Sequence, residues 1–195
     1  MTQHVEMVEN LERIAARLSN AGREVASKLQ TGLSAREIAS WEARLPFLLT
    51  REIEALFQWR NGTNVVEGDL LGHAYFFPGY YLLSIEEAVE TYEERRGTQQ
   101  WKDEWFPVCA DGGGDFYVVP CSGDKLDVAP VIGFLHGEPE QTVDYESLSA
   151  MMQTIEACYA EGAFFVDDDG ELEVDDDKHQ EIAHRFNPEV EEWQS

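Results

Sequence analysis

WFPVCADGGGDFYVV, at residues 105–119, places two apolar runs on either side of a glycine-rich turn. Short apolar and aromatic runs bounded by turn residues are typical of β-strands. The connection at residues 111–114 is too short for the helical crossover that parallel strands need. The sequence therefore predicts an antiparallel pair, with strands over residues 106–110 and 116–119.

Other runs of the same texture extend this pair into a sheet. We expect further strands over residues 74–77, 131–135 and 141–144, and the turn at His136-Gly137 is again too short for a crossover. The predicted fold class is α+β, with a central, mainly antiparallel sheet flanked by helices and an N-terminal helical segment.

The first third of the chain has the spacing of helices. Apolar residues recur every three or four positions over residues 5–29, which predicts one long amphipathic helix. Ser34 and Glu37 form a capping-box pattern for a second helix, which Pro46 stops. Thr50 can cap a third helix, and Asn61-Gly62 is expected to end it with left-handed residues.

Helices are also predicted after the first strand and after the last. Ser84 and Glu87 form another capping-box pattern, for a helix that runs to about Arg95. Ser147 is expected to cap a helix with three-and-four apolar spacing. A small hairpin over residues 164–166 and 171–174 and a last helix over residues 178–186 complete the prediction.

The charge balance narrows the class of partner. The chain has 39 acidic and 14 basic residues and a formal net charge of -25. Such a surface repels nucleic acid and anionic membranes, so neither is an expected partner. It favours encounter with basic proteins, but solubility alone explains it equally well. From Glu138 onward the chain holds 18 of the 39 acids and only two bases, Lys178 and Arg185.

Cysteine usage and the N-terminus indicate an intracellular protein. Cys109, Cys121 and Cys158 are odd in number, form no CxxC pair and lie among apolar residues, so we expect reduced core thiols. The N-terminal residues carry acids every few positions and no long apolar run, so neither a signal peptide nor a membrane span is expected. The predicted location is the cytoplasm.

Several patterns resemble metal or phosphate sites but fail in detail. Asp167-Asp168-Asp169-Gly170 suggests a calcium loop, yet alignment on the glycine puts Phe165 at the first ligand position, so a solvated acidic turn is expected. The glycine-rich turn between Asp111 and Asp115 lacks the Lys-Ser/Thr of a P-loop. We therefore predict no metal and no cofactor.

Catalytic patterns fail as well. His179 and His184 are five apart, not on one helix face, and are expected to be solvated. A Cys109 nucleophile with His73 or His136 has no local signature, and a buried strand cysteine is the commoner case. We predict no catalytic residue.

The aromatic residues are candidates either for the core or for an interface. We expect Trp59 and Trp105 in the core. The run over residues 76–81 contains Pro78-Gly79 and fits a core position and an interface position about equally well. Tyr80 and Tyr81 are its candidate contact residues.

An ordered set of motifs runs along the middle of the chain. The set starts with Leu45-Pro46 and a helix that carries Trp59 and leads to Asn61-Gly62. It continues with Trp105, Pro107, the Gly113-Gly114 turn, the strands around it, residues 130–132 and the Ser147-Leu148 helix start. This ordered set resembles the SUKH superfamily, in its Smi/Knr-like branch, and the resemblance covers roughly residues 45–159.

The resemblance implies an α+β fold without catalytic residues. Bacterial members are commonly immunity proteins that neutralise toxins, and fungal members include a cell-wall synthesis regulator. It leads us to expect a single SUKH-like domain over residues 1–195. This would comprise an N-terminal helical extension (1–33), a core (34–160) and an acidic C-terminal hairpin and helix (161–195).

The expected function is a non-catalytic protein-binding module, an immunity-like protein that neutralises a basic toxin. The alternatives are a regulatory scaffold or adaptor and, less favoured, a hydrolase or metal enzyme. The candidate partner-binding residues are Asp111, Asp115, Asp167, Asp168, Asp169, Tyr80 and Tyr81.

Overall fold

The computed structural model describes residues 2–66 and 68–194. Within them, the largest sheet has five strands in the order β3-β4-β5-β6-β7, and every neighbouring pair is antiparallel. The strands are β3 (Tyr81–Leu82), β4 (Trp105–Ala110), β5 (Phe116–Pro120), β6 (Val131–Phe134) and β7 (Thr142–Tyr145). The predicted α+β class is confirmed, as is the antiparallel pair across the glycine-rich turn.

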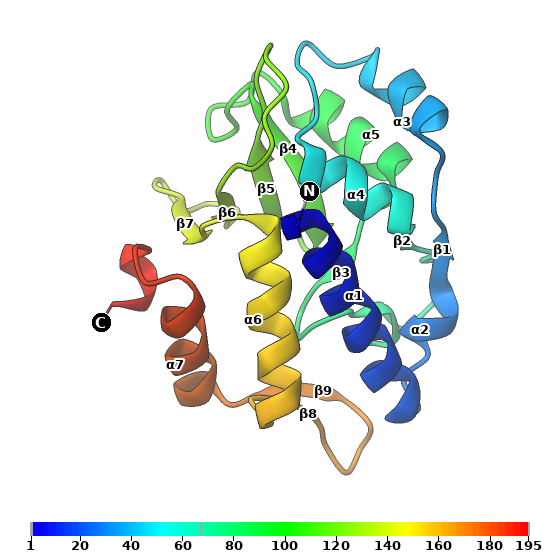
Figure 1. The fold of residues 1–195 in the computed structure, drawn as a ribbon, viewed down its shortest axis with the longest axis vertical. Helices are drawn as coiled ribbons and strands as arrows, with labels where there is room; N and C mark the ends of the chain where they lie inside the picture. The colour runs from blue at the N-terminus through cyan, green and yellow to red at the C-terminus, as the bar shows by residue number, and fades with distance from the viewer. Residues whose placement is uncertain (1, 67, 195) are drawn as a thin grey trace.

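Helices and two small strand pairs surround this sheet (Figure 1). The helices are α1 (Thr2–Asn20), α2 (Val25–Lys28), α3 (Ala35–Glu42), α4 (Arg51–Trp59), α5 (Ile85–Arg95), α6 (Leu148–Glu161) and α7 (Asp176–Phe186), with 3₁₀ turns η1 (Leu71–Ala74) and η2 (Glu191–Trp193). The small pairs are β1 (Leu29–Thr31) with β2 (Arg60–Thr63), and β8 (Phe164–Val166) with β9 (Leu172–Val174). In the part of the chain described, no helix has both the length and the apolar character needed to cross a membrane.

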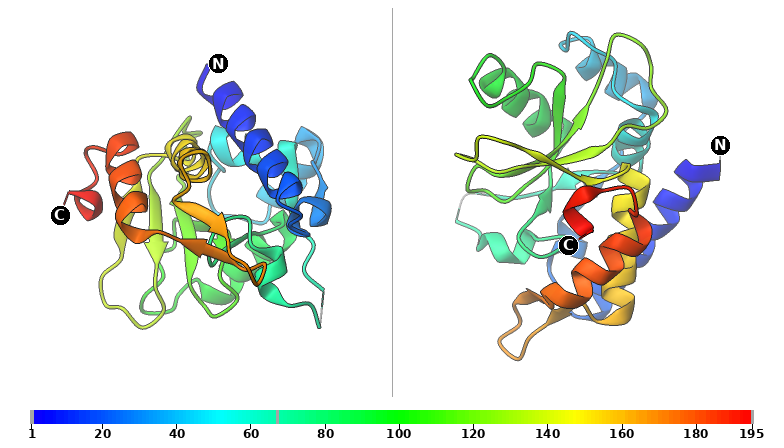
Figure 2. Two further views of the ribbon diagram at one scale, coloured as in Figure 1. Left: turned by 90° about the horizontal axis from the view of Figure 1, so that it is seen from below. Right: turned by 90° about the vertical axis from the view of Figure 1, so that its left-hand side faces the viewer.

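Side-chain alternation gives the sheet two faces with different covers. On one face, the Phe106 ring of β4 meets the Phe57 ring of α4 edge-on, with centroids 6.4 Å apart. On the other, which we call the Phe116 face, Trp101 packs against Phe116 and Phe134 at 5.8 and 5.1 Å. Figure 2 shows α6 above the sheet, with α1 on one side of it and α7 on the other.

The N-terminal segment packs along α6 (Figure 1). The apolar stripe of α1 is fully buried from Met7 to Leu18, and Arg17 forms a salt bridge with Glu156 of α6 at 2.9 Å. Burial of such a stripe, more than helix propensity, stabilises a helix of this kind.

The capping patterns form as expected. Ser34 with Glu37 and Ser84 with Glu87 make complete capping boxes for α3 and α5, and the side chains of Thr50 and Ser147 cap α4 and α6. Strand ends differ from the prediction by one residue or so, and α7 begins earlier, at Asp176, because the Asp175 side chain accepts the N–H of Lys178 at 3.2 Å.

The single helix predicted over residues 5–29 is wrong. The chain leaves α1 after Asn20, turns at Gly22 with φ +74°, and continues as the short α2 and strand β1. The apolar spacing concealed this break because Val25 still faces the core after the turn. A left-handed glycine just past a helix end is the usual C-terminal signal.

The strand predicted over residues 74–77 is also wrong. Ala74 ends η1, and Phe76 and Phe77 are buried in a loop that bends tightly at Pro78-Gly79, with φ +82° at Gly79. Two large buried aromatics therefore gave a strand-like pattern without a neighbouring strand to pair with.

Asn61-Gly62 plays a different part from the one predicted. The helix α4 ends at Trp59, and both residues lie in β2, where only Gly62 is left-handed, with φ +70°. The Asn61 Oδ1 atom instead accepts the N–H of Ile85 at 2.9 Å. This contact fastens β2 to the start of α5.

Candidate protein-binding surface

The glycine-rich turn between β4 and β5 is built around one carboxylate. Asp111 Oδ1 accepts the backbone N–H groups of Gly113, Gly114 and Asp115 at 2.7, 2.9 and 2.8 Å. Bonds of this kind from an aspartate hold a turn in one conformation. The positive φ angles of Gly112 (+83°) and Gly114 (+118°) require glycine. Asp111 is half-buried, and these bonds commit its Oδ1 atom to the turn.

The second aspartate of the turn, Asp115, connects it to the next loop. Its Oδ1 atom accepts the backbone N–H of His136, between β6 and β7, at 2.7 Å. On another side, the turn meets η1, because a Cβ atom at Gly112 would lie 2.3 Å from Leu71 Cδ2. The turn is thus held from two directions.

The two candidate tyrosines lie beside this turn. Tyr81 of β3 is paired with Ala110, the last residue of β4. The Tyr80 ring stacks on Phe77 at 5.4 Å and lies 4.7 Å from the ring of Tyr117. The structure therefore brings Tyr80 and Tyr81 to the end of the sheet that carries Asp111 and Asp115.

Electrostatics keep these phenols protonated. Burial raises the pKa of Tyr80 and of Tyr81, and the nearby carboxylates of Asp115 and Asp111 raise the Tyr80 value further. A half-buried phenol in its neutral form can donate one hydrogen bond to a partner.

A groove of about 380 Å³ opens between this turn and α5. We call it the acidic groove; its lining includes Tyr81, Gly112, Gly113, Gly114, Glu87, Glu90, Glu94 and Arg95. Glu87 is occupied by the capping box, where its Oε2 atom accepts the N–H and O–H of Ser84 at 2.8 and 2.7 Å. Glu90 and Glu94 are exposed and form no salt bridge with a described residue.

Sequence reasoning missed Glu90 and Glu94. The signal was present, because residues four apart on a helix share one face and α5 was predicted from its capping box. What the sequence did not indicate is that this face of α5 lies against the glycine-rich turn.

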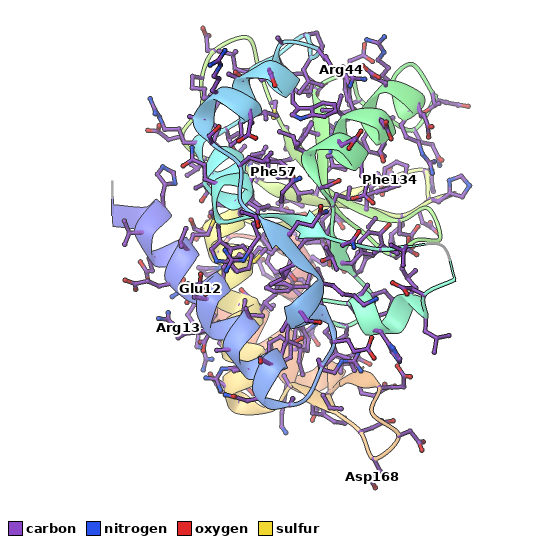
Figure 3. All side chains as sticks on the ribbon, turned by 90° about the vertical axis from the view of Figure 1, so that its right-hand side faces the viewer. Glu12, Arg13, Arg44, Phe57, Phe134 and Asp168 are labelled. Carbon is purple, nitrogen blue, oxygen red and sulfur yellow. The ribbon has the colours of Figure 1, made fainter. Side chains whose placement is uncertain are left out.

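The other candidate acids lie at the tip of the β8–β9 hairpin. Asp167 Oδ1 accepts the N–H groups of Asp169 and Glu171 at 2.9 and 2.8 Å, so this turn uses the same device as the first. Asp168 and Asp169 are exposed, and Figure 3 shows Asp168 at the tip, pointing away from the body of the protein.

A buried arginine ties this hairpin to η1. The Arg23 guanidinium donates to the carbonyl oxygens of Gly72 and Gly170, and the residue is 8% exposed. A Cβ atom at Gly72 would lie 3.1 Å from Glu171 Oε2. The two acidic turns therefore each contact η1, the first through Leu71 and the second through Gly72.

A second acidic surface was not predicted. A hollow of about 760 Å³, the C-terminal hollow, lies beside β7 and is lined in part by Val143, Glu146, Glu189, Glu191 and Glu192. Val143 is 40% exposed there. The sequence indicated that the C-terminal segment is acidic, but not that its glutamates meet an edge strand.

β7 also carries the half-buried carboxylate of Asp144. The pKa of Asp144 is raised to about 6, mainly by burial and in smaller part by the charge of Glu192. The hydrogen bond that Thr142 Oγ1 donates at 2.9 Å acts in the opposite direction and lowers the pKa. A carboxyl group whose pKa is raised on folding makes the folded state less stable as the pH rises from the unfolded value of 3.8 to about 6.

Asp144→Asn is expected to remove this loss of folded-state stability at higher pH. Relative to the native chain, the free energy of unfolding of the variant should rise from little change near pH 4 to a gain of about 3 kcal/mol near pH 7. The amide oxygen can keep the bond from Thr142. Urea unfolding at both pH values measures the difference. Asp124→Asn, at an exposed carboxylate, is the control. Equal shifts in the two variants would contradict the assignment.

The thiols are buried and free. Burial raises the pKa of Cys121 and of Cys158 to about 12 and that of Cys109 further, so the thiolate form is disfavoured. His73 Nδ1 lies 3.5 Å from Glu24 Oε2. Over residues 2–66 and 68–194, no three His, Cys, Asp or Glu side chains gather in a way that could hold a metal ion.

The prediction that His179 is solvated is wrong, whereas His184 is exposed as predicted. The His179 ring packs between Phe164 and Trp193 at 5.1 and 5.3 Å, because η2 brings Trp193 back beside α7. Burial lowers the pKa of His179, and its buried Nε2 atom has no hydrogen-bond partner among the residues that the structure describes.

Most of the motif residues have structural positions. Trp59 and Trp105 are 6% and 3% exposed, so their predicted core positions are confirmed. The Trp59 indole also donates to Glu12 Oε1 of α1 at 2.7 Å, and Figure 3 places Glu12 on that helix. Leu45 and Pro46 follow α3, and Pro107 is buried in β4.

Comparison with known families agrees with the motifs. The model of the SMI1 / KNR4 family (SUKH-1) matches residues 32–154, more than half of the chain. The match includes Tyr80, Tyr81, Asp111 and Asp115, and it ends before Asp167, Asp168 and Asp169. No curated protein matches the chain.

Proposed function

The chain belongs to the SMI1 / KNR4 family (SUKH-1), and from this membership we propose that it is a non-catalytic protein-binding module that binds and neutralises a basic toxin domain. The family suggests a protein-binding module of the immunity or regulatory kind. The observation that carries the proposal is the acidic groove, where the exposed Glu90 and Glu94, which form no salt bridge with a described residue, lie beside a turn fixed by Asp111.

The acidic groove suits a basic protein for two reasons. The carboxylates of Glu90 and Glu94 are presented by a helix and face a turn whose backbone is held by hydrogen bonds, so little order has to be gained on binding. The net charge of -25 extends the attraction beyond the contact and speeds encounter with a cationic surface.

Tyr81 adds an aromatic contact to these charges. It lines the groove, and its phenol remains neutral and able to donate. Tyrosine is among the residues that most often dominate the binding energy of an interface. The exposed Asp168 and Asp169, at the tip of the β8–β9 hairpin, add negative charge to the surface and carry less of the contact energy in this proposal.

The partner can be identified by co-purification from the source cells at low and at high salt, with mass spectrometry. Recovery of a basic toxin domain, followed by loss of its toxicity on mixing, supports neutralisation. Recovery of a housekeeping or envelope-synthesis protein supports the regulatory alternative. Turnover of a substrate by the purified chain would refute the non-catalytic role.

Glu90→Lys with Glu94→Lys is expected to weaken binding of the recovered partner by about a hundredfold, because two attractions become repulsions. The control, Glu86→Lys with Glu104→Lys, changes the net charge equally at exposed sites outside the groove and should weaken binding by less than about tenfold. Surface plasmon resonance at two ionic strengths measures both effects. Equal losses of affinity in the two double variants would mean that Glu90 and Glu94 act only through long-range attraction and not through contact with the partner.

A regulatory adaptor is the second candidate, and the C-terminal hollow favours it. Glutamates and the exposed Val143 beside β7 provide a second surface, separate from the acidic groove, at which another protein could be held. An adaptor should bind two partners at once, which sedimentation of the mixed proteins would detect.

A further inference from the structure

A larger hollow lies on the Phe116 face of the sheet. Its volume is about 830 Å³, and it opens between the loop after α5 and the β6–β7 connection. We call it the cationic hollow; its lining includes Arg95, Lys102, Trp105, Phe134, His136 and Gln141. The two rings come from β4 and β6, so the hollow is built on the sheet itself.

The two cations of this hollow, Arg95 and Lys102, lie over aromatic rings. Neither forms a salt bridge with a carboxylate of the described residues. Arg95 Cζ lies 5.2 Å from the centroid of Phe116, and Lys102 Nζ lies 5.0 Å from that of Trp105. Salt bridges to Asp or Glu engage other cations of the chain, namely Arg13, Arg17, Lys28, Arg44, Arg51, Lys125, Lys178 and Arg185.

This arrangement reverses the local sign of charge. Glu140 also lines the hollow, so its side chains carry two positive charges and one negative charge when His136 is neutral. The whole chain has 39 acidic residues against 14 basic ones. Cations held over aromatic faces without a counter-ion are available to an incoming anion.

We propose that the cationic hollow binds a carboxylate-bearing segment of the partner protein. The existence of a protein partner rests on the proposed function, whereas the hollow is a separate site from the acidic groove. Arg95 lines both, so the two surfaces meet there. The partner would then place basic residues against Glu90 and Glu94 and an acidic residue against Lys102.

Carboxylate fits the hollow better than phosphate. Phosphate sites commonly use the N–H groups of a helix N-terminus, whereas α5 reaches this region with its C-terminal end at Arg95. The partial negative charge of that end opposes any anion, and it opposes a doubly charged phosphate more than a singly charged carboxylate. The aromatic floor of Trp105 and Phe134 also suits the apolar stem of a glutamate.

Indole signals in proton–nitrogen NMR spectra of the full chain test this site. The chain has five tryptophans, each with one indole N–H. Titration with the peptide acetyl-Gly-Glu-Leu-Glu-Gly-amide should shift the signals of Trp105 and of its neighbour Trp101. The signals of Trp41 and Trp193, on other elements, should not move. The matched peptide with lysine in place of glutamate should leave Trp105 unchanged.

Two double variants localise the effect. Arg95→Gln with Lys102→Gln should weaken peptide binding by about tenfold or more, whereas Arg36→Gln with Arg96→Gln, which removes the same charge at exposed positions outside the hollow, should not. The proposal is wrong if the glutamate peptide leaves Trp105 unmoved at millimolar concentration, if both variants lose binding equally, or if inorganic phosphate shifts Trp105 more strongly.

The outcome is separable from that for the proposed function. If the glutamate peptide binds but no basic partner is recovered, the proposal for the cationic hollow is supported and the proposal of a toxin partner is wrong. If Glu90→Lys with Glu94→Lys abolishes binding of the partner but the glutamate peptide does not bind, the acidic groove is supported as the binding site and the proposal for the cationic hollow is wrong.

Discussion

Gly62→Ala should lower the free energy of unfolding by about 3 kcal/mol or more, from the left-handed backbone and the overpacking together. Gly62 has φ +70°, and a Cβ atom there would lie 2.3 Å from the backbone N of Ser84 and 2.4 Å from the backbone C of Leu83. Backbone atoms cannot move aside as the end of a flexible side chain can. Relief would require β2 to separate from the start of α5, where Asn61 accepts the N–H of Ile85.

Gly22→Ala is the matched control. Gly22 has nearly the same φ, +74°, but apart from its chain neighbours no described residue has an atom within 4 Å of the added Cβ, so only the backbone cost of about 1 kcal/mol applies. Urea unfolding of the two variants and the native chain measures the difference. Equal losses would mean that the contact between β2 and α5 yields easily, contrary to the close packing described.

Glu52→Ala should cost about 2 to 3 kcal/mol of stability, from the unpaired donors and the space left behind. Glu52 is fully buried, and its carboxylate oxygens accept the N–H groups of Leu148 and Ser149 at 3.2 and 3.0 Å. Alanine would leave these first amides of α6 without an acceptor. Burial raises the pKa of Glu52, against the bonds from Ser149 and Leu148, which lower it.

The raised pKa gives this effect a pH dependence. The stabilising contribution is full below the unfolded value of 4.5 and declines as the pH rises through the folded pKa, so the deficit of Glu52→Ala should be larger near pH 5 than near pH 7. Ser147→Ala, which removes only the bond from the Ala150 N–H, should cost about 1 kcal/mol. If Ser147→Ala proved the more damaging change, the carboxylate would not be the main cap of α6.

Local signals account for the parts of the fold that the sequence predicted. The capping boxes of Ser34 and Ser84 and the glycine-rich turn after Ala110 are each defined by residues close in sequence. By contrast, β3 has two residues and exists only because Tyr81 and Leu82 pair with the far end of β4. No periodicity can indicate a strand of that length.

The candidate binding residues also divide into those that local sequence indicates and those that depend on tertiary packing. Asp111 and Asp115 could be named because their turn is local, and the structure places Tyr80 and Tyr81 beside them. Glu90 and Glu94 were missed because their importance depends on how α5 packs. Their contact role, like that of the predicted residues, stays a prediction until the binding experiments are done.

The contacts of the buried Arg23 indicate how the N-terminal segment and the β8–β9 hairpin are expected to occur together among relatives. Arg23 precedes the family match at residues 32–154, and Gly170, whose carbonyl it binds, follows it. The segments before and after the matched residues are therefore fastened to each other, and loss of the hairpin would leave the buried Arg23 guanidinium without one of its acceptors. We expect them to have been acquired and retained as a pair, so relatives that lack the N-terminal helix should also lack the hairpin.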